Sequence, residues 1–236
     1  ASRFQKSTMK LQKETKPSLQ PHGRWYEDAC GTAFALELLG ERWSLLIVRE
    51  LMLGGRRFSD LRASLPGISA KVLTERLAGL ETAGVVRRSE LAQVPGVKVY
   101  ELTEWGKKAD AAIMELGRWA AMSPRHDPTL PLSPVSLMMS FRTMFDAQRA
   151  GGLALAGVML IGPESFTVTV ADGQLAIRRG RSDTAQFTLI APDAMTIAAA
   201  VYGKVAFAEL DLLQVQGNKA AARTYVSLFH LPQKLD

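Results

Sequence analysis

A proline-rich stretch divides this chain of 236 residues into two parts. Residues 122–134 read MSPRHDPTLPLSP and contain Pro124, Pro128, Pro131 and Pro134. Proline fixes φ and lacks the backbone N–H, so such a stretch neither continues a helix nor enters a central strand. The sequence therefore predicts a linker at 123–132 between folded domains at 25–122 and 133–236. Residues 1–24 are basic and have no apolar secretory segment, and we expect a flexible arm there.

The first domain is expected to be mainly helical and to contain one β-hairpin. The first helix should begin near Cys30, stop at Gly40, and turn Phe34, Leu38 and Leu39 inward. A hairpin is expected around Val94, where two β-rich segments flank a Val-Pro-Gly turn. The apolar periodicity places the further helices at 42–55, 57–67, 69–83 and 103–122, and the two strands within 84–91 and 96–103.

The predicted helix at 69–83 has two unlike sides. Leu73, Leu77 and Leu80 are spaced i, i+4 and i+7, so they form one apolar stripe. Lys71 and Thr74 fall on the opposite side. We therefore expect a helix that is anchored by its leucines and leaves a short polar face available for contact.

Positive charge is concentrated around this helix. The whole chain has a net charge of +6, and residues 42–88 alone carry nine Lys or Arg against four Asp or Glu, a net +5. A basic excess on one small unit is typical of a protein that binds a polyanion. The alternative interpretation is an ordinary solvated surface.

Helix, short turn, helix and β-hairpin follow one another in the order of a winged helix-turn-helix. In that arrangement the amino-terminal half of the second helix enters a major groove, and the hairpin grips the flanking phosphates. A helical interaction domain with solvating charges is the alternative. The residues predicted to contact DNA are Arg57, Ser59, Ser69, Lys71, Thr74, Arg76, Arg87, Arg88 and Lys98.

Residues from Cys30 to about Trp119 resemble the HxlR family of bacterial transcription regulators. The resemblance is carried by Trp43 and by the ordered motifs RFSDLR, LPGIS, LTERL and YELTEWG. It implies a homodimer that binds a pseudo-palindromic operator in double-stranded DNA. Glu90 departs from the pattern, because an acidic residue stands in the hairpin where a basic one is expected.

Cys30 is the single cysteine, so no disulfide can form within the chain. Several HxlR-like regulators have a redox-sensing cysteine just before the first helix, and Cys30 matches that place. A sensing thiol must be exposed and have a lowered pKa. Arg24 and the helix start would lower the pKa, whereas Glu27 and Asp28 would raise it. From the sequence we favour the alternative, a small buried side chain.

The second domain is predicted to combine a sheet with helices. Ser133 and Pro134 are typical of a helix start, and Asp172 and Gly173 are typical of a hairpin turn. The motifs FTVTVADGQLAIRRG, DTAQFTLIAPDAMTIAAAVYG and LLQVQGNKAAARTYVSLF resemble the sterol-carrier-protein-like fold. The resemblance implies a five-stranded sheet with helices around an apolar tunnel. We expect strands within 153–162, 166–180, 185–191 and 212–217, and helices within 133–150, 192–203, 204–211 and 218–230.

An apolar small molecule is the effector that this second fold would suit. Its aromatic and methionine side chains could line a tunnel or merely fill a core, in which case the domain would only stabilise a dimer. The candidate pocket residues are Phe141, Met144, Phe145, Phe166, Phe187 and Phe207. A lipid carrier with residual DNA binding is the alternative function for the whole chain.

Enzymatic signals are absent from the sequence. The three histidines, His22, His126 and His230, do not have the spacing of metal ligands. No phosphate-binding glycine loop or nucleophile elbow is present, so we expect no catalytic residue, metal or cofactor. No apolar run reaches the roughly 18–20 residues that span a bilayer. The sequence thus predicts an α+β, cytoplasmic, DNA-binding regulator with no membrane partner.

Overall fold

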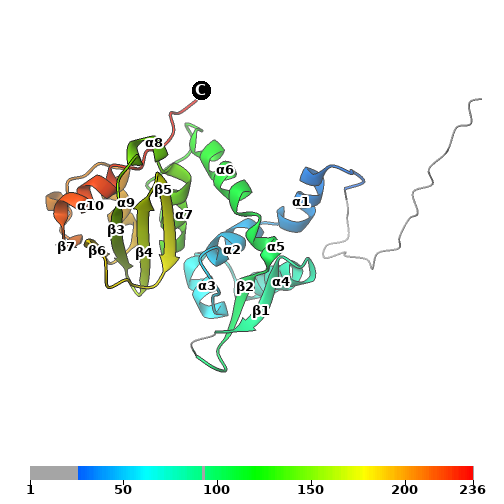
Figure 1. Cartoon of the computed structure of the whole chain (residues 1–236). Coiled ribbons are helices and arrows are strands. Elements are labelled where there is room, and N and C mark those ends of the chain that lie inside the picture. The colour runs from blue at the N-terminus through cyan, green and yellow to red at the C-terminus, as the bar shows by residue number, and fades with distance from the viewer. Residues whose placement is uncertain (1–25, 92–93, 236) are drawn as a thin grey trace, which may run out of the picture.

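The computed structural model describes residues 26–91 and 94–235, and the predicted arm at 1–24 lies outside them. The fold is mixed α+β and has two apolar cores, one on each side of the proline-rich stretch (Figure 1). In the described part of the chain, no helix is long and apolar enough to cross a membrane.

The first core is built around the leucine stripe. Leu73 and Leu77 are fully buried and Leu80 is 1% exposed, which confirms the predicted orientation of this helix. Ile47 and Leu61 from the two preceding helices complete the packing. The elements of this part are α1 (Gly31–Leu39), α2 (Ser44–Leu51), α3 (Phe58–Ser64), α4 (Ala70–Thr82), β1 (Val86–Glu90) and β2 (Lys98–Leu102).

Helix α1 differs from its prediction, because it has no buried residue. Phe34, expected to point inward, is 36% exposed, and Leu36 is 52% exposed. Leu38 and Leu39 are half-buried. The helix lies at the edge of the domain and contacts α4 (Figure 1). Of its apolar residues, Leu39 packs against the first core as predicted, whereas Phe34 and Leu36 remain exposed.

The predicted helix at 103–122 is two helices, α5 (Glu104–Lys107) and α6 (Asp110–Ala121). Thr103 starts α5: its hydroxyl accepts the Gly106 N–H at 3.0 Å and donates to the Gly84 carbonyl at 2.7 Å. Gly106 lies so close to the hairpin that a Cβ would stand 2.1 Å from the Val85 oxygen. This contact fixes α5 at the base of the hairpin, and α6 begins as a separate helix.

The second domain contains one five-stranded sheet in the order β5-β4-β3-β6-β7. Neighbouring strands are antiparallel except β3 and β6, which are parallel. Asp172 and Gly173 have φ of 50° and 68°, so both adopt the left-handed conformation that a two-residue hairpin turn requires. The strands are β3 (Leu155–Ile161), β4 (Glu164–Ala171), β5 (Gln174–Arg179), β6 (Phe187–Ala191) and β7 (Gln214–Gly217).

The helices of the second domain depart from prediction at two places. The expected helix at 133–150 breaks at Phe145, which is extended and bridges Phe229, while Asp146 caps the next helix. The expected helix at 204–211 is only a short 3-10 turn, η1 (Phe207–Glu209). The helices are α7 (Pro134–Met144), α8 (Ala147–Ala150), α9 (Ala194–Val201) and α10 (Lys219–Val226), and α7, α9 and α10 contact the sheet (Figure 1).

Candidate nucleic-acid interface

Helix α4 presents a polar face at its amino-terminal end. Ser69 caps the helix, because its hydroxyl oxygen accepts the Val72 N–H at 3.2 Å. Lys71 is exposed over 86% of its side chain, and its distance of 4.0 Å from Glu75 leaves the ammonium group largely to solvent. A reachable cation at a capped helix start is suited to a phosphate or a guanine edge.

The hydroxyl groups of Thr74 and Ser59 are already partly engaged. Thr74 donates its proton to the Ala70 carbonyl at 2.9 Å, so its oxygen keeps only acceptor capacity for an outside donor. Ser59, exposed at the start of α3, donates to Asp60 at 3.2 Å. Both side chains are exposed. Thr74 is therefore suited to accept from a base amino group rather than to contact a phosphate.

Arg76 lies differently from the other predicted contacts. Its side chain is only 16% exposed and pairs with Glu41 at 3.0 Å. Its Nε also donates to the Arg42 carbonyl at 3.2 Å. These bonds tie α4 to the segment between α1 and α2. The geometry thus favours a role for Arg76 inside the domain rather than at DNA.

The hairpin carries three exposed cations with different partners. Arg87 pairs with Glu101 at 2.8 Å, and Arg88 pairs with Glu81 at 3.1 Å. Arg88 also lies over the ring of Tyr100, 5.3 Å from its centroid. Lys98 has no ion-pair partner within the described chain, although it stands opposite Glu90 in the strand register. Phosphates would therefore compete with carboxylates for both arginines.

Arg57 is an exposed cation next to α3. Its backbone N–H donates to Asp60 at 3.4 Å, which caps the helix start. Among the residues that the structure describes, no carboxylate lies within ion-pair distance of its guanidinium. Arg57 is thus free to bind an anion from outside.

Cys30 is exposed, so the expectation of a buried side chain is wrong. It precedes α1, and hydrogen bonds from Thr32 and Ala33 lower the pKa of its thiol. The physical reason is that the first N–H groups of a helix have no partner within it and stabilise a thiolate. Of the neighbours weighed from the sequence, Asp28 accepts the Cys30 N–H at 2.9 Å, and Arg24 lies outside the described residues.

Most of the predicted pocket residues belong to the second core. Phe141 and Phe166 are fully buried and Phe187 is 1% exposed. Phe141 stacks on Phe229 with ring centroids 4.6 Å apart, and Met144 is 8% exposed. Phe141, Phe166 and Phe187 belong to the second core, and the half-buried Phe145 packs against it.

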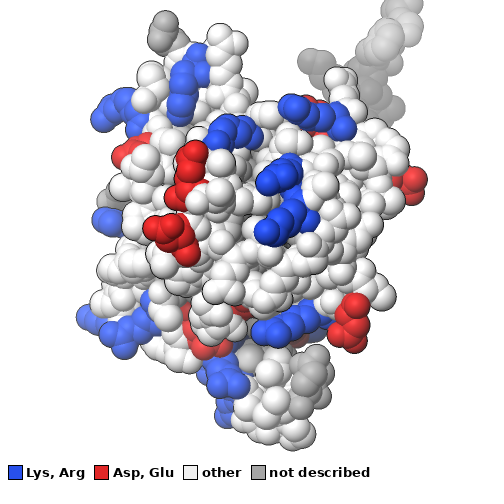
Figure 2. Space-filling model, turned by 90° about the vertical axis from the view of Figure 1, so that its left-hand side faces the viewer, with Lys and Arg blue, Asp and Glu red and all other residues white. Residues whose placement is uncertain are grey.

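Phe207, unlike the buried phenylalanines, lines a cavity. That cavity has a volume of about 450 Å³, with Val205 and Val226 beside Phe207 and with Arg149, Lys204 and Arg223 as its cationic groups. Burial and the nearby Arg149 lower the pKa of Lys204. On the face that Figure 2 shows, Lys and Arg side chains are scattered among Asp and Glu. In the described residues no cluster of His, Cys, Asp and Glu could hold a metal ion.

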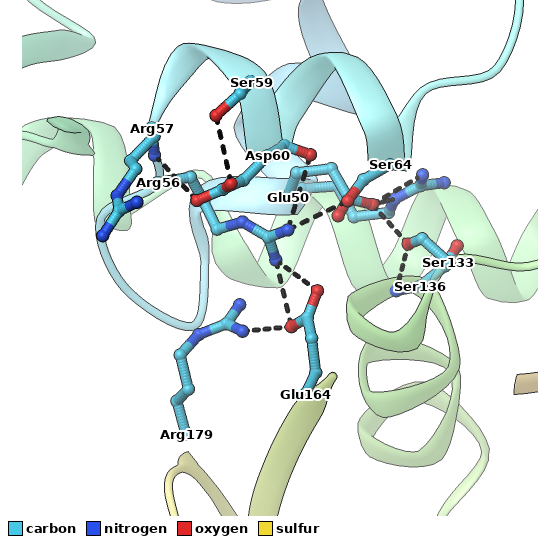
Figure 3. A network of polar contacts seen from close by, with 11 residues as sticks. Glu50, Arg56, Arg57, Ser59, Asp60, Ser64, Ser133, Ser136, Glu164 and Arg179 are labelled. Atoms are coloured by element: carbon cyan, nitrogen blue, oxygen red, sulfur yellow. Dashed lines mark hydrogen bonds and ion pairs between the residues drawn. The ribbon is translucent and has the colours of Figure 1, made fainter. Parts of the chain in front are cut away.

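A polar network between the domains was not predicted from the sequence (Figure 3). Arg56, 7% exposed, pairs with Glu164 at 2.9 Å, and Glu164 also pairs with Arg179. Glu50 is fully buried and accepts from Ser133 at 2.6 Å. The only local signal was the charge of these residues, because no spacing in the sequence links positions 56 and 164.

Comparison with known proteins matches the first domain. Residues 38–127 match the HxlR-like helix-turn-helix family. An uncharacterized HTH-type transcriptional regulator of Bacillus subtilis strain 168, YvaP, is 42% identical over 86 residues, which are 36% of this chain and 80% of YvaP. The HTH-type transcriptional regulator YodB of the same strain is also 42% identical over 86 residues, 36% of this chain and 77% of YodB. The structure of reduced YodB superposes with a TM-score of 0.37 and 38% identity, covering 42% of this chain and 98% of YodB.

Proposed function

The chain belongs to the HxlR-like helix-turn-helix family of bacterial transcription regulators, and from this premise we propose that it reads a pseudo-palindromic operator as a homodimer. The observation that carries the proposal is helix α4. Its leucines are buried, whereas Lys71 is 86% exposed at a capped helix start. We assign direct contacts to Lys71, Thr74 and Ser69, and backbone contacts to Arg57, Ser59, Arg87, Arg88 and Lys98.

Exposed apolar side chains on two helices support the homodimer. On α6, Leu116 is 48% and Trp119 is 72% exposed, and on α1, Leu36 is 52% exposed. Tyr26, just before α1, is 57% exposed. Exposed apolar side chains that form one patch mark a surface that another protein covers, and we propose that these residues form such a patch in the dimer interface. A two-fold dimer formed there would present two α4 helices to successive major grooves, about 34–36 Å apart.

The proposal is tested by selection of duplexes from a random-sequence pool, followed by footprinting and sedimentation. We expect an inverted repeat, symmetric protection and a sedimenting dimer. A monomer with an asymmetric footprint would contradict the homodimer. Failure to bind any duplex would favour the alternative, a lipid carrier with residual DNA binding.

For the second domain we propose a sterol-carrier-like fold that senses an apolar molecule. The five-stranded sheet with its helices and the cavity beside Phe207 support this assignment. Dodecanoate and dodecanol are suitable probes, because an apolar ligand raises the melting temperature by mass action. If neither probe shifts the melting temperature, and removal of residues 133–236 abolishes dimerisation, the domain has a structural role instead.

A thiol sensor is the second candidate function, and the exposure and lowered pKa of Cys30 favour it. If Cys30 senses oxidants, diamide should change duplex affinity in the parent protein and leave Cys30→Ser unaffected. An equal response of both proteins would remove this candidate.

A further inference from the structure

A groove of about 950 Å³ runs between the two domains. Its walls come from α2, α3, the hairpin, the proline-rich stretch, the start of α7, the start of β4 and the end of β5. Pockets of 300–1,000 Å³ at domain interfaces, apolar with a few convergent polar groups, are the usual form of a small-molecule site. The apolar lining includes Trp43, Leu46, Leu65, Val99, Leu132 and Pro163.

The polar lining of the groove has an excess of positive charge. Arg49, Arg56, Arg57 and Arg179 line it, together with the acids Asp60 and Glu164. Arg49 is neutralised by the buried Glu50 behind the wall, at 3.0 Å. Four cations against three carboxylates leave a net charge of +1, which one anionic group would balance.

The excess positive charge is centred on three largely buried residues, Glu164, Arg56 and Arg179. Glu164 is the shared partner of Arg56 and Arg179, whose side chains are 8% and 30% exposed, while that of Glu164 is 13% exposed (Figure 3). Two guanidinium groups thus share one carboxylate. The Nε and Nη2 atoms of Arg179 are buried and have no acceptor within the described chain. Buried donors of this kind are normally hydrogen-bonded, so an acceptor is missing here.

We propose that the groove binds a small monoanion with an apolar body, its carboxylate or sulfonate taken up by Arg179 and Arg56. The apolar part of the lining favours a ligand with an apolar body over a purely hydrophilic anion such as phosphate, and the single excess charge favours one negative charge over two. Because Nε and Nη2 of Arg179 are buried, the anion must displace Glu164 from the guanidinium group before it can accept from these unpaired donors.

If an anion competes with Glu164 for Arg56, the effect is transmitted to the DNA-binding domain through the other contacts of Arg56. The Arg56 backbone pairs with Tyr100 of the hairpin, with N···O distances of 2.9 and 2.8 Å, and its side chain donates to Ser64 of α3 at 3.0 Å. Its bond to Glu164 joins these elements to β4. An anion that weakens this bond frees the hairpin and α3 from the second domain, a regulatory effect that rests on the proposed function.

The experiment uses two fluorescent probes with the same rings on the full chain. They are 8-anilinonaphthalene-1-sulfonate and its neutral counterpart, N-phenyl-1-naphthylamine. We expect the parent to bind the sulfonate about tenfold tighter, the difference that one charge-assisted contact typically gives. Arg179→Gln should lose this preference and keep its affinity for the neutral probe. Arg178→Gln, an exposed neighbour on the same strand, should behave like the parent.

Three outcomes would overturn the proposal: equal affinity of the parent for both probes, an unchanged preference in Arg179→Gln, or loss of the preference in Arg223→Gln. The last would place the anion in the cavity beside Phe207. If Arg179→Gln does not fold, Arg57→Gln decides, because Arg57 lines the same groove and contributes to its excess positive charge. A fall of about threefold in sulfonate affinity supports the groove, and no change refutes it. Duplex affinity is measured separately with each probe present. If the full chain binds no duplex, the proposed function is contradicted, but the binding of the two probes still tests the groove.

Discussion

Arg56 and Glu164 are separated by 108 positions in the sequence and form an ion pair of 2.9 Å between the two domains. Both side chains are nearly buried, so each is a costly group to leave without its partner. Arg179 makes the second contact to the same carboxylate. The pairing therefore links the stability of the chain to the relative placement of its two halves.

Glu164→Gln should destabilise the chain by about 3 kcal/mol, the lower end for breaking a buried pair, because Arg179 is partly exposed. The substitution keeps the shape of the side chain and removes its charge. Urea unfolding of the full chain measures the effect. Glu104→Gln is the matched control, since that carboxylate is 86% exposed and its loss should cost almost nothing. Equal stability of the two variants would contradict the structural role of Glu164.

Lys71→Ala and Thr74→Ala should each weaken operator binding by roughly 1–3 kcal/mol if these residues read bases. Both side chains are exposed, so thermal stability should change by no more than about 0.5 kcal/mol. Fluorescence anisotropy with operator and with unrelated duplex separates specific from non-specific binding.

Leu77→Ala is the control for this helix. Leu77 is fully buried, and its truncation should cost about 2–5 kcal/mol of stability through the cavity it leaves. The prediction fails if both surface variants bind operator like the parent and Leu77→Ala folds normally. That result would mean that another face of α4 is turned to DNA.

Lys98→Ala should weaken binding to any duplex and lower the salt slope by about one unit, because a phosphate contact releases a counterion. Arg88→Ala should do the same with a smaller loss of affinity, since Arg88 gives up Glu81 when it binds phosphate. Duplex affinity at several salt concentrations provides the measurement. Parent-like slopes in both variants would exclude the hairpin from the DNA interface.

Trp119→Glu should convert the dimer into a monomer, because a charge would enter the centre of the proposed apolar interface. Sedimentation velocity distinguishes the two states. Leu212→Glu is the matched control: Leu212 is 64% exposed on the second domain, and we expect that variant to remain dimeric. Dissociation of the control, or a dimeric Trp119→Glu, would place the interface elsewhere.

Alkylation of Cys30 by iodoacetamide should reach its plateau at a lower pH than in the urea-unfolded chain. The thiolate is the nucleophile, and a lowered pKa raises its fraction at neutral pH. Thr32→Val removes one of the hydrogen bonds that lower the pKa, so the midpoint should move upward. A midpoint in the folded chain at or above that of the unfolded chain would contradict the structure at this residue.

The elements that sequence reasoning predicted correctly depend on short-range signals. The stripe of Leu73, Leu77 and Leu80 required only the period of one helix. Ser69 and Ser133 cap their helices with hydroxyl groups that accept an N–H three residues later. Asp172 and Gly173 form their turn because both tolerate positive φ. Each signal lies within a few residues and is independent of the rest of the fold.

Tertiary structure decided the features that depend on distant partners. The break between α5 and α6 follows from the approach of Gly106 to Val85, and the position of Arg76 follows from its pairing with Glu41. The groove exists only because two domains meet around Glu164. The sequence determined which residues are charged, apolar or able to cap a helix. Which charges are paired, buried or left open to a ligand was decided by packing, because burial and ion pairing are set by groups brought together from far along the chain.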